Sequence, residues 1–264
     1  MATSDRLSGP SCGSLLCLPT YDERENLPRM IDALEAVRDA VPGGLDVMVI
    51  DDDSPDGTGR LADELAVGRP WLTVLHRARK EGLGRAYLDG FAIALDLGYE
   101  RVLEMDCDFS HDPAEVPRLV RAAIEGADLV LGSRYVPGGG VENWGIVRRI
   151  ISAGGCAYAR TILGMGVRDV TGGFKCFRRT TMAAIDLEHV DAQGYTFQIE
   201  MTYRALRGGF VVVELPITFR DRVAGGSKMS RSIVLEAAWR VPLLRVAALR
   251  GRIVGRSPDA LLVS

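Results

Sequence analysis

Residues 47–58 read VMVIDDDSPDGT, so that four consecutive apolar residues run directly into three consecutive carboxylates. An uninterrupted apolar run of this length is typical of a strand that is buried on both faces of a sheet. Helical spacing of apolar residues follows over 57–67. The stretch therefore predicts a strand, an acidic loop and a helix, which together are the first part of a βαβ unit.

The same alternation continues on both sides of this stretch. Other short apolar runs, which predict strands, occupy 15–18, 72–76, 102–105, 129–131 and 211–219. Helical spacing lies between most of them, over 28–39, 83–97 and 113–124. Strands separated by helices predict an α/β fold with a mostly parallel sheet flanked by helices.

The second half of the chain is less regular. It predicts a flexible loop over 137–140, a helix over 144–163, a loop entering a short strand over 169–177, a helix over 195–206 and a basic, glycine-rich loop over 222–230. We expect a flexible tail over 1–12, a catalytic domain over 13–231 and an amphipathic segment over 232–264.

The composition excludes some functional classes. The chain has 264 residues, 47% of them hydrophobic and 25% charged, with a net charge of −3. These are ordinary globular values, which argue against a nucleic-acid partner. The five cysteines form no CxxC pair, and their scattered positions fit a reduced, cytoplasmic protein. The first residues do not resemble a signal peptide, and no run of about 18 apolar residues predicts a transmembrane helix.

A second acidic pair follows the apolar run at 102–105. In extended backbone the side chains of residues i and i+2 lie on one face, so Asp106 and Asp108 can bind one cation together. Oxygen ligands favour Mg²⁺ or Mn²⁺ over zinc, and Ser110 adds a third oxygen. Because ligands of parallel sheets bind beyond the carboxyl ends of the strands, we predict a metal site at Asp106, Asp108 and Ser110.

Each acidic cluster also has a purely structural explanation. The run 51–53 can form a solvated turn, with Asp56 capping the next helix. Two other functional classes fit less well. The GLG sequence at 82–84 is followed by Tyr87 where a dinucleotide-binding motif needs glycine. A signalling receiver module is a single small domain, about half the length of this chain.

Several short blocks occur in a fixed order: LPTYDEREN (18–26), DDDSPDGT (51–58), DCD (106–108), GSRY (132–135), TGGFK (171–175) and GGSKMS (225–230). Each block alone is weak evidence, but their order is specific, and they span roughly residues 14–235. Together they resemble the family-two inverting glycosyltransferases, and among these the polyprenyl-phosphate (dolichyl-phosphate) mannose synthases.

The resemblance implies a GT-A fold, which is a Rossmann-like nucleotide-binding domain with C-terminal acceptor-binding elements. It implies metal-dependent transfer of mannose from GDP-mannose to a polyprenyl monophosphate, with inversion. Matched residue by residue, it implies donor-binding roles for Pro19, Tyr21, Glu23, Asp51, Asp52, Asp106, Cys107, Asp108, Arg134, Arg222 and Lys228. It implies acceptor-binding roles for Arg148, Lys175 and Ser227, and catalytic roles for Asp106, Asp108, Arg134 and Arg148.

Two positions depart from the family's motifs. Asp22 stands where the opening motif has asparagine, and Asp53 where the acidic motif has glycine or asparagine. Neither is a predicted metal ligand, so the departures bear on base specificity rather than on activity. Two alternatives stay open: a UDP-sugar donor carrying glucose or N-acetylglucosamine, and a nucleotide-sugar-binding subunit without catalytic activity.

The reaction makes simple demands on the protein. A divalent cation stabilises the negative charge that develops on a nucleoside diphosphate leaving group, and arginine or lysine side chains add to that effect. A phosphate monoester has a second pKa of about 6 and is largely a dianion at neutral pH. Such an acceptor needs no general base, so we predict that the enzyme aligns two anionic substrates, with Arg148 and Lys175 receiving the acceptor phosphate.

Apolar residues and arginines are mixed over 232–252, where Pro242 predicts a kink or an interruption. Three interpretations are open: an amphipathic segment on an anionic membrane surface, a helix packed on the core, and a docking site for a separate membrane-spanning partner protein. We expect a protein peripherally associated with the cytoplasmic face of the membrane.

Overall fold

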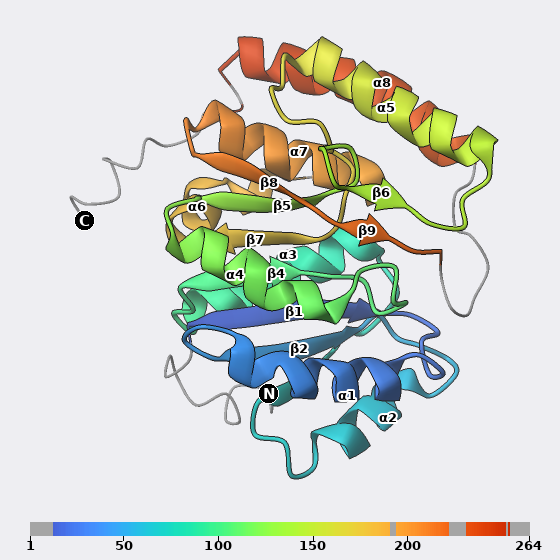
Figure 1. Cartoon of the computed structure of the whole chain (residues 1–264), viewed down its shortest axis with the longest axis vertical. Coiled ribbons are helices and arrows are strands. Elements are labelled where there is room, and N and C mark those ends of the chain that lie inside the picture. The colour runs from blue at the N-terminus through green and yellow to red at the C-terminus, as the bar shows by residue number, and fades with distance from the viewer. Residues whose placement is uncertain (1–12, 191–193, 222–230, 252, 254–264) are drawn as a thin grey trace.

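The computed structural model describes residues 13–190, 194–221, 231–251 and 253, without the side chains of Tyr195 and residues 231–237. Its centre is a seven-stranded sheet in the order β3-β2-β1-β4-β7-β5-β8 (Figure 1). The strands are β1 Ser14–Thr20, β2 Leu45–Asp51, β3 Leu72–His76, β4 Arg101–Glu104, β5 Leu129–Ser133, β7 Lys175–Arg178 and β8 Val212–Pro216. Only β7 runs antiparallel to its neighbours, β4 and β5. The predicted mostly parallel sheet is confirmed.

Helices cover both faces of this sheet (Figure 1). One face packs against α1 Leu27–Val37, α2 Thr58–Ala66 and α4 Val116–Ile124. The other packs against α3 Leu83–Asp96, α6 Arg179–Ala184 and α7 Gly194–Arg207. Among the described residues, short 3₁₀ helices lie at Arg38–Ala40, Pro113–Glu115 and Leu187–His189. The apolar strands are thus buried on both faces, which is why they read as continuous apolar runs.

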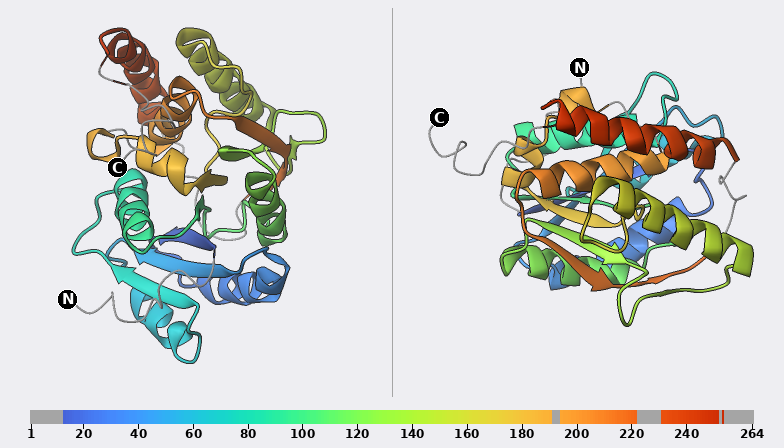
Figure 2. Two further views of the ribbon diagram at one scale, coloured as in Figure 1. Left: turned by 90° about the vertical axis from the view of Figure 1, so that its left-hand side faces the viewer. Right: turned by 90° about the horizontal axis from the view of Figure 1, so that it is seen from above.

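Two long helices, α5 Ile146–Leu163 and α8 Arg231–Leu249, lie side by side outside α7 (Figures 1 and 2). Val241 and Ala248 of α8 are buried in the core cluster on this face of the sheet. The Tyr158 hydroxyl of α5 donates to the Ala238 carbonyl at 2.7 Å. The helix continues through Pro242, so of the kink or interruption predicted there, the interruption does not occur.

The predicted strand at 211–219 divides into two. Its first part is β8, and its second part, β9 Thr218–Phe219, pairs with β6 Gly140–Val141 in a separate small sheet. Ile217 lies between the two parts, and its N–H donates to Ser133 in β5 at 3.0 Å, whereas its carbonyl accepts from Gly140 at 3.0 Å. The chain therefore leaves the main sheet at this residue, and Gly140 belongs to a strand instead of the predicted loop.

Residues 1–12 and 254–264 lie outside the described part of the chain, as do 222–230. The tail at 1–12, the basic loop and the domain boundaries therefore stay predictions. In the described part, no helix combines the length and the apolar character that crossing a bilayer requires.

Candidate active site

The carboxyl ends of β1, β2 and β4 bring the N-terminal sequence blocks together. Thr20 at the end of β1 is in register with Asp51 at the end of β2. The Asp52 N–H donates to the Thr20 carbonyl at 3.0 Å, and the Asp22 N–H donates to the Ser54 hydroxyl at 3.2 Å. The predicted donor-binding segments thus meet at one edge of the sheet, where ligands of parallel sheets bind.

The loop after β4 is held in a tight turn. Asp108 is buried, and its carboxylate accepts a hydrogen bond from the Ser110 N–H at 3.0 Å. Phe109 between them has φ 61°, in the left-handed region that is uncommon for an aromatic residue. Strained backbone of this kind persists where the surrounding structure fixes it, commonly at functional sites. The half-buried Asp106 precedes this turn.

His111 supports this loop as a neutral side chain. Burial lowers its pKa to about 4, because the charged imidazolium is poorly solvated there. Its Nδ1 accepts a hydrogen bond from the Asp106 N–H at 3.3 Å, so its proton lies on Nε2. The ring stacks on Phe174, with centroids 5.1 Å apart, and meets Phe219 edge-on. His111 therefore fixes the position of the Asp106 backbone.

The residues of this loop fit a hard divalent cation. Asp106 and Asp108 supply carboxylate oxygens, and the Ser110 hydroxyl is buried with no hydrogen-bond partner among the described residues. Burial raises the pKa of the Tyr87 hydroxyl, and the negative charges of the surrounding carboxylates, that of Asp106 foremost, raise it further. In the described part of the chain, no three acidic, histidine or cysteine side chains form a complete metal cage. These few oxygen ligands suit a cation such as Mg²⁺, which leaves some of its coordination positions open for the phosphates of a substrate.

Asp51 and Asp52, which were both predicted to bind the nucleotide, differ in their hydrogen-bond partners. The Asp52 carboxylate pairs with Arg77 and accepts from the N–H groups of Glu81 at 3.2 Å and Gly82 at 3.0 Å. It therefore anchors the loop that leads into α3. Asp51 accepts from the Ser54 N–H at 3.3 Å through Oδ2, while its buried Oδ1 has no hydrogen-bond partner among the described residues. Of the two, Asp51 keeps an acceptor for a ligand.

The opening block lies beside this acidic edge. Lys80 places its ammonium 3.3 Å from the centroid of the Tyr21 ring. Glu23 accepts from the Asn26 side-chain amide at 2.7 Å, and its N–H donates to the Thr58 hydroxyl at 3.1 Å. Pro19 is half-buried at the end of β1, and Cys107 is buried in the loop after β4. The sequence analysis assigned no role to Lys80, although it is one of only three lysines in the chain.

The two departures from the family's motifs preserve backbone shape. Asp22 has φ 56° and Asp53 has φ 60°, both in the left-handed region. Asparagine, aspartate and glycine tolerate this region better than other residues. The structure thus explains why asparagine or glycine at these two positions can be exchanged for aspartate.

Arg134, predicted at the phosphates, is buried in a charge pair. Its Nε and Nη2 each donate to the Asp169 carboxylate at 2.7 Å, and Nη2 also donates to the Thr171 hydroxyl at 2.7 Å. Burial opposes the charge on Asp169, but Arg134 and its hydrogen bonds hold the pKa of that carboxyl below its usual range. These contacts make Arg134 an organiser of the loop 169–171. Nothing in the sequence pointed to Asp169 beyond its place two residues before the TGGFK block.

Lys175 does not lie where it was predicted. Its side chain is 1% exposed, and its ammonium lies 3.4 Å from the Glu104 carboxylate. The same ammonium donates to the carbonyl and to the side-chain oxygen of Gln198. Lys175 faces Glu104 because antiparallel β7 places the two residues opposite each other. An acceptor phosphate cannot reach this ammonium, so the predicted acceptor contact is replaced by a structural role.

Arg148 lies near the surface of α5. Its guanidinium stacks on Trp144 at 4.2 Å from the ring centroid and donates to Asp221 at 2.7 Å, while its Nε has no hydrogen-bond partner among the described residues. Trp144 and Asp221 were missed by the sequence analysis. The predicted Arg222, Ser227 and Lys228 follow Asp221 directly or closely, and all three lie outside the described residues.

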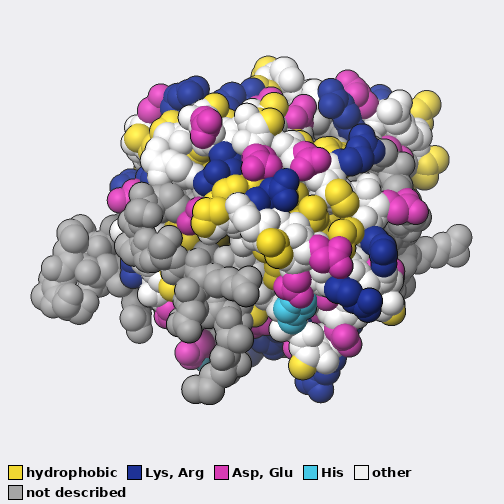
Figure 3. Space-filling model, turned by 90° about the horizontal axis from the view of Figure 1, so that it is seen from below, with side chains coloured by type: hydrophobic (Ala, Val, Ile, Leu, Met, Phe, Trp, Pro, Cys, Tyr) yellow, Lys and Arg dark blue, Asp and Glu magenta, His cyan; other side chains and the backbone are white. Residues whose placement is uncertain are grey.

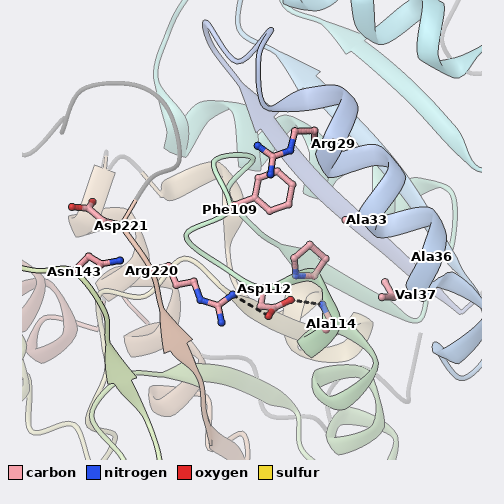
Figure 4. A pocket seen from close by; sticks show the side chains of 11 residues that line it. Arg29, Ala33, Ala36, Val37, Phe109, Asp112, Ala114, Asn143, Arg220 and Asp221 are labelled. Carbon is pink, nitrogen blue, oxygen red and sulfur yellow. Dashed lines mark hydrogen bonds and ion pairs between the residues drawn. The ribbon is translucent and has the colours of Figure 1, made fainter.

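A cavity of about 660 Å³ borders the loop after β4 on its α1 side (Figure 4). Its walls include Arg29 and Phe109, whose side chains stack at 5.3 Å, and Asp112, which pairs with Arg220 at 3.6 Å. Asp106 and Asp51 are not among its lining residues. The cavity is therefore separate from the acidic edge, which the strand topology and the unpaired oxygens identify as the candidate active site.

Comparison with known proteins agrees with this geometry. Residues 15–185 match the family described as Glycosyl transferase family 2. A polyprenol monophosphomannose synthase of Mycolicibacterium smegmatis is 49% identical over 233 residues, which are 88% of this chain and 86% of the relative. An undecaprenyl-phosphate mannosyltransferase of Micrococcus luteus is 48% identical over 243 residues, 90% of this chain and 98% of the relative.

A solved structure shows the same fold. Glucosyl-3-phosphoglycerate synthase from Mycobacterium tuberculosis, determined with Mn²⁺ and UDP-glucose, superposes with a TM-score of 0.62 at 20% identity. The similarity covers 88% of this chain and 78% of that chain. The family match, the relatives and the order of the sequence blocks agree, and the chain belongs to glycosyl transferase family 2.

Proposed function

We propose that the protein transfers mannose from GDP-mannose to a polyprenyl monophosphate, with inversion at the anomeric carbon and with Mg²⁺ or Mn²⁺ bound. The names of the two relatives at 48–49% identity support the sugar and the acceptor class. The observation that carries the proposal is the Asp106–Asp108 loop, which follows β4 at the same edge of the sheet as Asp51.

Asp106, Asp108 and Ser110 would hold the metal ion, which when bound neutralises the charge of the leaving diphosphate. The protein's own part is to bind and align the donor. Asp51 has a buried acceptor oxygen without a partner among the described residues at this edge of the sheet, and directly after β1 the Tyr21 ring lies under the Lys80 ammonium. Aligned substrates lose less entropy on the way to the transition state, which accounts for much of the acceleration in such reactions.

No general base is required of the protein. The acceptor is mostly a dianion at neutral pH, and the histidine of this site, His111, is neutral with its Nδ1 already engaged. Arg148, which is only partly buried and keeps an N–H without a partner among the described residues, is our candidate for the acceptor phosphate. In this proposal Asp221 holds the guanidinium until the phosphate arrives.

A donor panel tests this function. We expect the purified protein to form glycolipid from GDP-mannose, short polyprenyl phosphates and Mg²⁺ or Mn²⁺, and to lose that activity in EDTA. Product would be measured by thin-layer chromatography with radiolabelled donor. Product only from UDP-glucose or UDP-N-acetylglucosamine would overturn the choice of donor, and donor binding without product would identify a non-catalytic subunit.

We further propose that α5 and α8 rest on an anionic membrane surface, which brings the site to a lipid acceptor. Large apolar side chains are exposed on both helices, among them Ile146 at 75%, Ile150 at 66%, Trp239 at 54% and Leu249 at 74%. The sequence of α5 contains arginines but no acidic residue. The opposite end of the molecule shows acidic and basic side chains interspersed (Figure 3). Exposed apolar groups beside arginines are typical of interfacial helices.

Introducing negative charge into the apolar face tests the membrane surface without any activity assay. We expect Ile146→Glu/Ile150→Glu to reduce co-flotation with vesicles of anionic phospholipid about tenfold, because two apolar anchors become anions. A matched control is Val67→Glu/Ile124→Glu, since Val67 directly after α2 and Ile124 at the end of α4 are 75% and 50% exposed, away from α5 and α8. If the two double variants float equally well, α5 and α8 are not the membrane-binding surface. If the protein binds vesicles only when a second membrane protein is present, these helices dock on a partner protein instead.

A further inference from the structure

Phe219, the last residue of β9, lies between two parts of the candidate active site. Its ring meets the His111 ring at 82°, with centroids 5.3 Å apart, and the Trp144 ring at 73°, also at 5.3 Å. Near-perpendicular aromatic pairs at this distance are favourable and directional. His111 belongs to the loop after β4 and Trp144 to the segment between β6 and α5. One side chain therefore packs two separate segments against each other.

Each outer ring of this aromatic column (His111, Phe219 and Trp144) supports one group of the site. His111 accepts the Asp106 N–H through Nδ1 at 3.3 Å, and so holds the backbone of a proposed metal ligand. Trp144 lies under the guanidinium of Arg148, 4.2 Å from its carbon, and Arg148 is the candidate for the acceptor phosphate. The aromatic column therefore connects the segment that would hold the cation to the arginine that would hold the acceptor.

The main chain of β9 bridges the same two segments. The Phe219 carbonyl accepts from the Glu142 N–H at 2.8 Å, and the Arg220 N–H donates to the Ser110 carbonyl at 3.2 Å. Neither bond involves the side chain of Phe219, so we expect β9 to keep its place when that ring is replaced. The ring then decides how closely the aromatic column is packed, which a substitution can test.

A buried charge pair ties the middle of the column to the central sheet. The Arg134 guanidinium lies 5.4 Å from the centroid of the Phe219 ring. Arg134 directly follows β5 and donates twice to the Asp169 carboxylate at 2.7 Å, with both side chains buried. A functional group is held most precisely when rigid elements and a supporting layer of side chains fix it. Phe219 belongs to such a layer, because its ring packs on the fixed guanidinium.

The reaction depends on the distance between the two segments. In the proposed function the donor diphosphate is bound at the loop after β4, whereas the acceptor phosphate is bound by Arg148. Transfer needs reacting atoms about 3–3.5 Å apart, and a displacement of about 1 Å caused by a change far from the chemistry can slow a reaction about a hundredfold. A residue that sets this distance therefore affects the rate more than it affects either affinity.

We propose that Phe219 is a positioning residue which, through the aromatic column, holds the loop after β4 and Arg148 at the separation that transfer requires. The inference rests on the proposed function, because that function assigns the cation to this loop and the acceptor phosphate to Arg148. Phe219 contacts neither substrate in this proposal, and it acts through His111 on one side and through Trp144 on the other.

The first test separates rate from affinity. We expect Phe219→Leu, which stays apolar but loses the ring, to lower kcat for transfer from GDP-mannose to a short polyprenyl phosphate about tenfold. The dissociation constants of Mn²⁺ and of the polyprenyl phosphate, each measured by calorimetry, should change less than about twofold, because no ligand contact is removed. An unchanged kcat, or a loss that lies wholly in one of the two affinities, would overturn the proposal.

Thr218→Ser is the matched control on the same strand. The side chain of Thr218 is exposed, and alternation along a strand places it on the face opposite to Phe219. This variant should match the wild type in kcat and in both affinities. If Phe219→Leu does not fold, Phe219→Met serves the same comparison, since methionine is apolar and adapts to irregular space.

A double-mutant cycle tests whether the column acts as a unit. Trp144→Leu breaks the column at its other contact, so we expect Phe219→Leu to lower kcat less than about twofold in that background, against about tenfold in the wild type. A tenfold loss in both backgrounds would show an independent, merely structural contribution and refute the role of Phe219. The absence of GDP-mannose turnover in the wild type would instead refute the proposed function.

Discussion

We expect the double substitution Asp106→Asn/Asp108→Asn to lower mannosyl transfer about a thousandfold while the protein stays folded. The two carboxylates are the charged oxygens of the loop that would hold the cation, and amides bind a hard divalent cation far more weakly. The loss corresponds to about 4 kcal/mol of transition-state stabilisation, since each factor of ten is worth about 1.4 kcal/mol, and such a contribution is ordinary for a catalytic metal.

Two quantities are measured: the steady-state rate of transfer, and the affinity for Mn²⁺ by calorimetry. Both should fall together in the double variant, while the thermal midpoint should stay the same or rise, because two neighbouring negative charges are removed. Asp112→Asn is a matched control on the same loop. Asp112 accepts from the Ala114 N–H at 3.0 Å, which asparagine can also do. Transfer at the wild-type rate in the double variant would refute the metal site and, with it, the proposed mechanism.

The second large effect concerns stability. We expect Asp169→Ala to lower the free energy of unfolding by about 3–5 kcal/mol, the cost of leaving a buried charge without its partner. The reason is that Arg134 and Asp169 are both buried and form two hydrogen bonds of 2.7 Å. Urea unfolding at neutral pH would measure the difference. Asp32→Ala is the control, because Asp32 is 69% exposed in its pair with Arg69, and an exposed pair is worth less than about 1 kcal/mol.

The same pair predicts a dependence on pH. The pKa of Asp169 is lowered in the folded state by Arg134, so its stabilisation is complete above the unfolded pKa of about 3.9 and is lost as the pH falls through the lower, folded value. The gap in unfolding free energy between wild type and Asp169→Ala should therefore be constant near neutral pH and shrink in acid. A gap that persists unchanged in strong acid would mean that packing, and not the charge pair, causes the loss.

Much of the site was predictable because it lies in short segments at strand ends. The Asp106–Asp108 pair and the run at Asp51 could be found since each follows an apolar run directly. Lys175 shows the limit of this reasoning. It belongs to a sequence block, yet its ammonium is buried against Glu104, and only the antiparallel register of β7 and β4 brings these two residues together.

The partners missed by the sequence analysis share one property. Asp169 pairs with Arg134 from 35 residues away, Asp221 pairs with Arg148 from 73, and Gln198 contacts Lys175 from 23. No spacing rule connects residues so far apart, because each contact is made by segments from different elements. The exposed apolar face of α5 was missed for the same reason, since an apolar run does not tell whether another helix will cover it.

By itself the sequence determined the alternation of strands and helices, the mostly parallel sheet and the acidic ends of two strands, because these depend on periodicity and composition within about 20 residues. Tertiary structure alone decided which charged side chains pair inside the protein and which keep an atom without a partner among the described residues. Burial and pairing depend on contacts between distant segments, and a lysine or arginine has the same letters in either role. The buried ion pairs of Lys175 and Arg134, and the Asp51 Oδ1 that has no partner among the described residues, follow from those contacts.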